Sequence, residues 1–131
     1  MKLSQLLERM DYTCVQGSVD IPISHLLYDS RNACPDGVFV CISGAVMDGH
    51  KFISDVVMKG VTAVIVEKEV KTPAHVTVIR VENTRSALAY MSAAYFGYPA
   101  EQLKTIGITG TKGKTTTTYM VRSILENSGF R

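Results

Sequence analysis

Apolar residues recur along the chain in two spacings that alternate from one end to the other. Short apolar or β-branched runs bounded by turn residues predict strands over residues 23–28, 38–42, 63–66, 76–81 and 103–109. Apolar residues at helical spacing predict helices over residues 3–10, 52–61, 84–96 and 114–127. Gly60 is placed to stop the second helix, and Asn83 or Thr84 can cap the third. Strands that alternate with helices indicate an α/β fold with a largely parallel sheet.

A break in this pattern at residues 97–102 predicts a domain boundary. We expect one domain over residues 1–98 and the start of a second over residues 99–131. The second domain has one strand and one helix, and the expected buried stripe of that helix is Met120, Val121, Ile124 and Leu125. One strand and one helix cannot bury their own apolar faces, so we expect this domain to be incomplete and the chain to be cut from something longer.

Composition and charge exclude several classes of protein. The 131 residues carry 14 basic and 12 acidic side chains, and the basic ones are scattered, so neither nucleic acid nor an anionic membrane is expected as the main partner. No apolar run approaches the roughly 18 residues of a membrane-spanning helix, and the charged start is unlike a signal peptide. Cys14, Cys34 and Cys41 form no C-x-x-C pair, which favours free thiols in a reduced, cytoplasmic setting. Cys41 is interpreted as a small core residue of a strand.

The strongest chemical signal is the segment Gly-Thr-Lys-Gly-Lys-Thr-Thr at residues 110–116, between a predicted strand and a predicted helix. Backbone N–H groups in such a turn, together with the helix N-terminus, attract phosphate. The predicted ATP-binding residues are Gly110, Thr111, Lys112, Gly113, Lys114, Thr115 and Thr116. Lys114 would place its ammonium on the β- and γ-phosphates as the catalytic residue, and Thr115 would offer a hydroxyl to Mg²⁺.

The phosphate loop departs from the general G-x-x-x-x-G-K-[ST] pattern. That pattern has a glycine five residues before Gly113, where this chain has Ile108, and the glycine present is Gly110. We expect the Lys112 side chain to face solvent. The alternative is a Gly/Thr/Lys turn that binds no ligand.

The shorter G-T-x-G-K-T-T form at the end of a strand resembles the Mur ligase family of peptidoglycan synthesis. Further motifs at residues 29–31, 37–40 and 48–53 resemble the N-terminal domain that MurE and MurF ligases share. The amino-acid sequence at residues 107–115 is closer to the MurE type. The resemblance covers essentially the whole chain. It implies a small α/β UDP-binding domain, followed by the first strand, phosphate loop and helix of an incomplete ATP-binding domain.

The resemblance also implies which residues hold the uridine diphosphate end of the substrate. These are Tyr28, Ser30, Ala45, Val46 and Met47. Ser30 offers a hydroxyl, whereas the loop at residues 45–47 lacks the polar side chains that other family members carry there, so its contacts are expected through main-chain groups.

The implied reaction is ATP-dependent amide synthesis through an acyl-phosphate. MurE ligases add meso-diaminopimelate or L-lysine to UDP-N-acetylmuramoyl-L-alanyl-D-glutamate, and we expect this chain alone to be inactive. Two alternatives are a MurF-type ligase that adds D-alanyl-D-alanine and a non-catalytic nucleotide-binding module.

Several polar and aromatic residues have simpler structural interpretations. Asp29 and Arg31 could pair or cap a turn as readily as contact a ligand. Asp48 is expected to start a helix, and His50 to have a structural role. The remaining expectations are that His25 and His75 are incidental and that Phe39 and Phe52 belong to the core.

Overall fold

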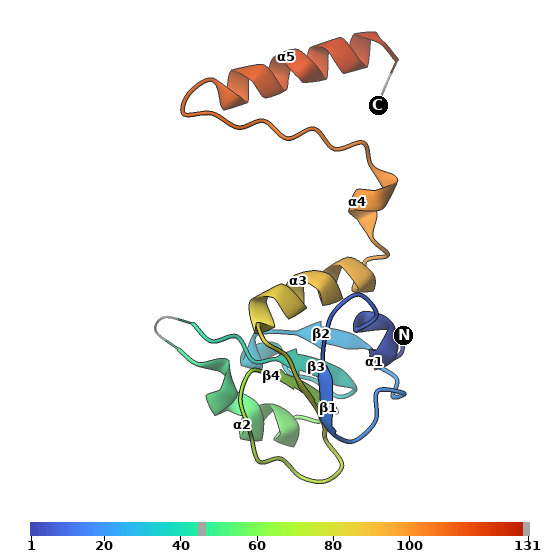
Figure 1. Cartoon of the computed structure of the whole chain (residues 1–131), viewed down its shortest axis with the longest axis vertical. Coiled ribbons are helices and arrows are strands. Elements are labelled where there is room, and N and C mark those ends of the chain that lie inside the picture. Colours follow the sequence, from blue (N-terminus) through green and yellow to red (C-terminus); the bar gives the residue numbers. More distant parts are fainter. Residues whose placement is uncertain (45–46, 130–131) are drawn as a thin grey trace. The chain divides into compact units, whose positions relative to one another are not determined.

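The computed structural model describes residues 1–44 and 47–129 and divides into two compact units, Met1–Pro99 and Ala100–Arg131 (Figure 1). The elements of the first unit are α1 (Leu3–Leu6), β1 (Thr13–Gln16), β2 (His25–Leu27), η1 (Ser30–Asn32), β3 (Gly37–Val40), η2 (Gly49–Phe52), α2 (Ile53–Met58), β4 (Ala63–Val66), β5 (Thr77–Arg80) and α3 (Thr84–Tyr95). The remaining helices are α4 (Pro99–Gln102) and α5 (Lys114–Asn127). In the described part of the chain, no helix has both the length and the apolar character needed to cross a bilayer.

The five strands form one sheet in the order β1-β5-β4-β3-β2. Strands β2, β3, β4 and β5 pair in parallel, and β1 pairs with β5 in the antiparallel direction. The predicted α/β class with a largely parallel sheet is therefore confirmed. Because the four parallel strands share one direction, the segments that follow them emerge at the same edge of the sheet, which we call the carboxyl edge.

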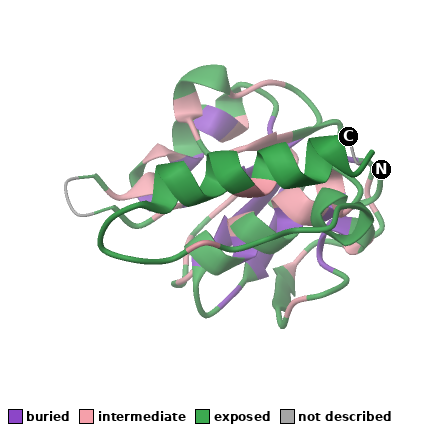
Figure 2. Cartoon of the chain, turned by 90° about the horizontal axis from the view of Figure 1, so that it is seen from above, coloured by how far each residue is buried: buried purple, intermediate pink, exposed green. Residues whose placement is uncertain are grey.

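Each face of the sheet has its own core, because successive side chains of a strand point to opposite faces. One core joins the sheet to α1 and α3 through Val38, Val40, Ile65, Ile79, Leu3, Leu6 and Met91. The other core joins the opposite face to α2 through Phe39, Val64, Val66, Val78, Ile53 and Val56. Figure 2 colours the chain by burial, with buried residues in purple. The central strands β3 and β4 are buried at every position, as the continuous apolar run at residues 63–66 predicts.

Local capping explains where two of the helices begin and end. The Asn83 side chain accepts a hydrogen bond from the Ser86 amide, which caps α3 as predicted. Gly60 has φ +91° just after α2, and a Cβ there would lie 3.2 Å from Pro35. Glycine is therefore required both for the left-handed backbone and for the close approach of the Pro35 segment.

The structure corrects four expectations about secondary structure and burial. The first helix ends at Leu6 instead of Met10, and β1 was not predicted because it is a short edge strand whose residues are mostly exposed. Residues 103–109 are not a strand, because a strand needs a hydrogen-bonded neighbour and the described part of the second unit offers none. No residue of α5 is buried, so the expected stripe at Met120, Val121, Ile124 and Leu125 is uncovered within its own unit.

Core packing in the first unit leads to a matched pair of stability predictions. Met91→Ala removes a fully buried side chain, so we expect the free energy of unfolding to fall by about 2–5 kcal/mol. Met58→Ala makes the same change in a helix at a side chain that is 80% exposed, and we expect a loss within about 0.5 kcal/mol. Urea unfolding of the 131-residue chain measures both. Equal losses in the two variants would contradict the assignment of the core.

Candidate functional site

A cavity of about 610 Å³ opens at the carboxyl edge, beside the ends of β2 and β3. Its lining residues are Tyr28, Asp29, Ser30, Arg31, Phe39, Ile42, Gly44, Met47, Gly49 and Phe52. The structure thus brings together Tyr28, Ser30 and Met47, which the sequence analysis singled out from separate motifs. Ala45 and Val46, the other two residues predicted for this site, lie outside the described residues.

One wall of the cavity is the turn that follows β2. The Asp29 carboxylate accepts a hydrogen bond from the Arg31 amide at 3.0 Å and so caps η1. The same carboxylate forms an ion pair with the Arg31 guanidinium at 2.6 Å. Hydrogen bonds from Arg31 lower the pKa of Asp29 to about 2. The pairing of Asp29 with Arg31 considered above is therefore confirmed, and it orders the segment that carries Ser30.

A tight turn forms a second wall of the cavity. The Gly44 amide donates to the Met47 carbonyl at 2.9 Å, and Ser43 forms a β-bridge with Asp48. A Cβ at Gly44 would lie 2.7 Å from the Met47 carbonyl oxygen, which is too close for any other residue to keep this geometry. The close approach of the two ends of the turn therefore depends on glycine at position 44.

The floor of the cavity is apolar, and the sequence analysis predicted its residues Phe39 and Phe52 only as members of the core. Phe39 is buried, as expected for a core residue, and its ring also lines the cavity together with Ile42. Phe52 is half-buried instead of fully in the core, because it lies between this cavity and a second one. An apolar floor with polar groups at the rim suits a flat ring that carries hydrogen-bonding edges. Of these residues only Ile42 ends a predicted strand, whereas Phe39 lies within one and Phe52 begins a predicted helix.

The second cavity, of about 420 Å³, shares Ser30, Arg31 and Phe52 with the first. Its lining adds Asp55, Met58 and Lys59. The Lys59 ammonium donates to the Ser30 carbonyl at 2.7 Å, so two cationic side chains, from Arg31 and Lys59, flank the Ser30 segment. The Lys59 ammonium, the Arg31–Asp29 ion pair and the Asp55 carboxylate therefore lie together beside the apolar floor.

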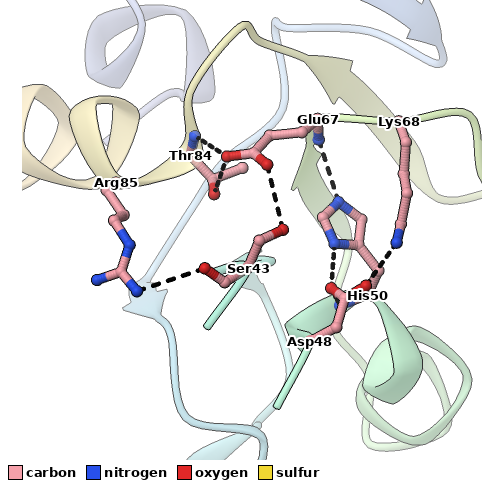
Figure 3. Close-up of polar contacts among 7 residues, drawn as sticks. All are labelled: Ser43, Asp48, His50, Glu67, Lys68, Thr84 and Arg85. Carbon is pink, nitrogen blue, oxygen red and sulfur yellow. Dashed lines mark hydrogen bonds and ion pairs between the residues drawn. The ribbon is translucent and has the colours of Figure 1, made fainter. Parts of the chain in front are cut away.

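Behind the tight turn lies a network of polar side chains, shown in Figure 3. Asp48 caps η2 by accepting a hydrogen bond from the His50 amide, and its carboxylate also binds the His50 ring and the Lys68 ammonium. These contacts, led by Lys68, hold the pKa of Asp48 well below its usual range. The expected roles of Asp48 as a helix start and of His50 as a structural residue are confirmed. His25 and His75 are both exposed.

In the second unit, α5 begins at Lys114, at the position predicted for the helix that follows the phosphate loop. Gly113 caps it with φ +77° and Gly110 has φ +155°, both in the region that favours glycine. The first amide to enter the hydrogen-bond ladder of the helix is that of Thr117, which donates to the Gly113 carbonyl at 2.9 Å. The amides of Lys114, Thr115 and Thr116 precede this ladder and are available to an anion.

The side chains at the start of α5 divide into two groups. The Lys114 ammonium lies over the loop and donates to the Gly110 carbonyl at 2.8 Å. The hydroxyls of Thr117 and Thr118 donate to the main-chain carbonyls four residues earlier, at 2.9 Å each. Of the segment's remaining side chains, Lys112 is exposed. Amides, an ammonium and a left-handed glycine cap fit a polyphosphate chain.

The phosphate loop offers few side chains that could ligate a metal ion. Among the described residues no group of three or more His, Cys, Asp or Glu side chains could hold a metal ion. The Thr115 hydroxyl is the predicted ligand, and a hard cation such as Mg²⁺ commonly takes its other oxygen ligands from substrate phosphates and water. The residues present therefore fit Mg²⁺ only together with a bound nucleotide.

With the geometry described, comparisons with known proteins identify the family. Residues 22–96, more than half of the chain, match the family described as "Mur ligase family, catalytic domain". The chain therefore belongs to the Mur ligase family. The matched segment contains both walls and the floor of the larger cavity.

Curated relatives narrow the likeness to one type of ligase. The chain is 44% identical over 130 residues to the UDP-N-acetylmuramoyl-L-alanyl-D-glutamate–2,6-diaminopimelate ligase of Clostridium perfringens. The aligned region covers 99% of this chain and 27% of that protein. It is 41% identical over 134 residues to the ligase of the same name from Clostridium tetani, with 100% and 28% covered. The predicted resemblance to the MurE type is confirmed. The chain spans little more than a quarter of the length of these relatives.

Solved structures give the same fold. The chain resembles MurF from Acinetobacter baumannii with a TM-score of 0.68 at 33% identity, over 96% of this chain and 27% of that one. It also resembles the MurF ligase from Thermotoga maritima in complex with ADP, with a TM-score of 0.55 at 28% identity, over 79% of this chain and 23% of that one.

The lowered pKa of Asp48 leads to a prediction about acid stability. The folded state favours the ionised carboxylate, so its contribution to stability is complete above the unfolded pKa of about 4 and is lost as the pH falls toward the lower folded value. We expect Asp48→Asn to lower stability near pH 7 and to flatten the decline of the unfolding free energy below about pH 4. Urea unfolding across pH 2.5–7, a range set by these pKa values, measures the slope.

The control for this prediction is Asp11→Asn, which changes an exposed carboxylate that forms no ion pair with the described residues. It should keep the wild-type acid slope. A wild-type slope in Asp48→Asn as well would show that the contacts of Asp48 do not contribute to acid stability.

Proposed function

We propose that this chain supplies the UDP-binding domain and the phosphate loop of a cytoplasmic, ATP-dependent ligase of peptidoglycan synthesis. The ligase would add diaminopimelate, or L-lysine in its place, to UDP-N-acetylmuramoyl-L-alanyl-D-glutamate. The observation that carries the proposal is the N-terminus of α5, where the amides of residues 114–116 precede the hydrogen-bond ladder of the helix and the Lys114 ammonium lies on the Gly110 carbonyl. The names of the relatives with 41–44% identity support the substrate class.

The larger cavity suits the uridine diphosphate end of such a substrate. We assign the uracil ring to the apolar floor of Phe39 and Phe52, where ring edges can reach polar groups at the rim. The Ser30 hydroxyl and the main chain of the 45–47 loop would supply hydrogen bonds, and Tyr28 would border the ring. Arg31 and Lys59 flank Ser30 and would attract the two negative charges of a diphosphate.

The phosphate loop would bind and orient ATP for acyl-phosphate formation. The substrate carboxylate oxygen attacks the γ-phosphorus, and the bond to the ADP oxygen breaks. The incoming amine then attacks the acyl carbon, loses a proton and displaces phosphate, which leaves an amide. The Lys114 ammonium and the amides of residues 114–116 would stabilise the negative charge on the transferring group. Mg²⁺, bound through the Thr115 hydroxyl and the phosphates, would supply further charge neutralisation.

A MurF-type ligase remains the second candidate, because solved MurF structures share the fold at 28–33% identity. The higher identity to the diaminopimelate ligases favours the MurE type. The described residues provide no site for the incoming amino acid, so we expect the 131-residue chain by itself to release no phosphate from ATP.

The UDP site can be tested on the chain as it is. We expect UDP to bind the wild-type chain in a calorimetric titration, and Ser30→Ala to weaken the affinity about tenfold because one hydrogen bond to a charged ligand is lost. Ser54→Ala makes the same change at an exposed serine of α2 outside both cavities and should bind UDP like the wild type. Absence of UDP binding to the wild-type chain would overturn the assignment of the cavity.

The ligase activity can be tested in a chimera in which this chain replaces the matching 27% of the Clostridium perfringens ligase. We expect the chimera to join diaminopimelate to the UDP-linked dipeptide substrate and Lys114→Ala to lower kcat by about 10²- to 10³-fold, as loss of transition-state charge stabilisation does. Lys71→Ala, an exposed lysine far along the chain from the phosphate loop, should keep the activity of the chimera. Full activity of Lys114→Ala would exclude the proposed role of Lys114.

A further inference from the structure

Both ends of the tight turn beside the larger cavity are tied to a single residue, Glu67, which follows β4. We call Ser43–Gly44 and Met47–Asp48 the loop roots. At the first root, the Ser43 hydroxyl donates to Glu67 Oε2 at 3.1 Å. At the second root, Asp48 holds the His50 ring, and that ring accepts a hydrogen bond from the Glu67 amide at 3.1 Å. Figure 3 shows that the bond from Ser43 and the chain of bonds from Asp48 through His50 both reach Glu67.

The hydrogen bonds of His50 determine where its proton lies. The Glu67 amide can only donate, so Nε2 of His50 must present a lone pair. The proton therefore lies on Nδ1, which donates to Asp48 Oδ1 at 2.6 Å. The His50 side chain is only 4% exposed, so no water replaces these partners at low cost. The ring is a neutral bridge between the second loop root and the backbone at the end of β4.

Glu67 is itself held by the start of α3. Its Oε1 accepts hydrogen bonds from the Thr84 amide at 2.7 Å and from the Thr84 hydroxyl at 2.8 Å. These bonds, with that from Ser43, lower the pKa of Glu67 and keep it an acceptor. Arg85 adds a hydrogen bond to the Ser43 carbonyl at 3.3 Å. The loop roots are thus anchored to rigid elements of the fold and not only to each other.

We propose that Glu67 and His50 are positioning residues that hold the loop roots at the spacing required for ligand binding in the larger cavity. This inference rests on the proposed function, because it takes UDP as the ligand. Neither Glu67 nor His50 lines that cavity, whereas Gly44, Met47 and Gly49 all do. A change at Glu67 or His50 therefore reaches a ligand only through the turn, by letting the Gly44 and Gly49 amides leave their partners, the Met47 and Ile42 carbonyls.

Three variants separate positioning from general stability. Glu67→Ala removes the carboxylate arm to Ser43, and His50→Ala removes the bridge to Asp48. Glu67→Gln keeps an oxygen for Thr84 and an amide that can donate to the Ser43 hydroxyl, so it should rescue the first loss. Met91→Ala is the stability control, because it weakens a core of the same chain without removing a hydrogen bond of the loop roots. His75→Ala is the matched histidine control at an exposed position.

The measurements are amide hydrogen exchange and calorimetric titration with UDP on the 131-residue chain. In Glu67→Ala and His50→Ala we expect the Gly44 and Gly49 amides to exchange at least about tenfold faster and the Kd for UDP to rise about tenfold, since a lost hydrogen bond to a charged or buried group has about that effect. Glu67→Gln, Met91→Ala and His75→Ala should keep the wild-type Kd. Wild-type exchange in both alanine variants would overturn the proposal, and so would faster exchange with an unchanged Kd.

A spectroscopic measurement tests the His50 bridge directly. In long-range ¹H–¹⁵N correlation spectra of the wild-type chain, we expect His50 to show a protonated Nδ1 and an unprotonated Nε2. A protonated Nε2 would overturn the bridge to the Glu67 amide. If the wild-type chain fails to bind UDP, the proposed function fails, whereas faster exchange of Gly44 and Gly49 in the alanine variants would still support the hold on the loop roots.

Discussion

Parallel pairing of β2, β3 and β4 is the constraint on which the larger cavity depends. Because these strands share one direction, the turns after β2 and β3 and the residue after β4 are delivered to one edge of the sheet. Segments as distant in sequence as Ser30, Gly44 and Glu67 become neighbours for that reason alone. Backbone hydrogen bonds fix the strand spacing and the two cores hold the sheet between its helices, so the turns at the carboxyl edge start from a rigid base.

The two proposed ligand sites, one in each unit, differ in their chemistry. In the first unit the Lys59 ammonium and the Arg31–Asp29 ion pair lie beside an apolar floor. In the second unit the main chain supplies most of the attraction, through amides that the helix leaves unpaired, and Lys114 adds one full charge. The first arrangement suits a ring with a short anionic tail, and the second suits a chain of phosphates.

Much of the fold could be predicted from the sequence, because the buried strands at residues 37–40 and 63–66 are apolar at nearly every position and Asn83 marks the start of α3. The edge strand β1 could not be, since its exposed residues carry no pattern that a core would impose. The lining of the larger cavity was predicted in part, at Tyr28, Ser30 and Met47. The hydrogen bonds of Glu67 could not be predicted, because they join segments 17 to 24 residues apart. A charged residue directly after a buried strand was nevertheless a usable signal.

The hydrogen bond of the Lys114 ammonium to the Gly110 carbonyl would have an energetic consequence for the proposed nucleotide binding. A free lysine side chain carries about 2 kcal/mol of rotamer entropy, which a ligand normally has to overcome when it immobilises the chain. Here the ammonium already donates a hydrogen bond to the Gly110 carbonyl. A phosphate bound as proposed would replace the Gly110 carbonyl with a partner of higher charge, so part of the ordering of this side chain would precede binding and less affinity would be lost to it.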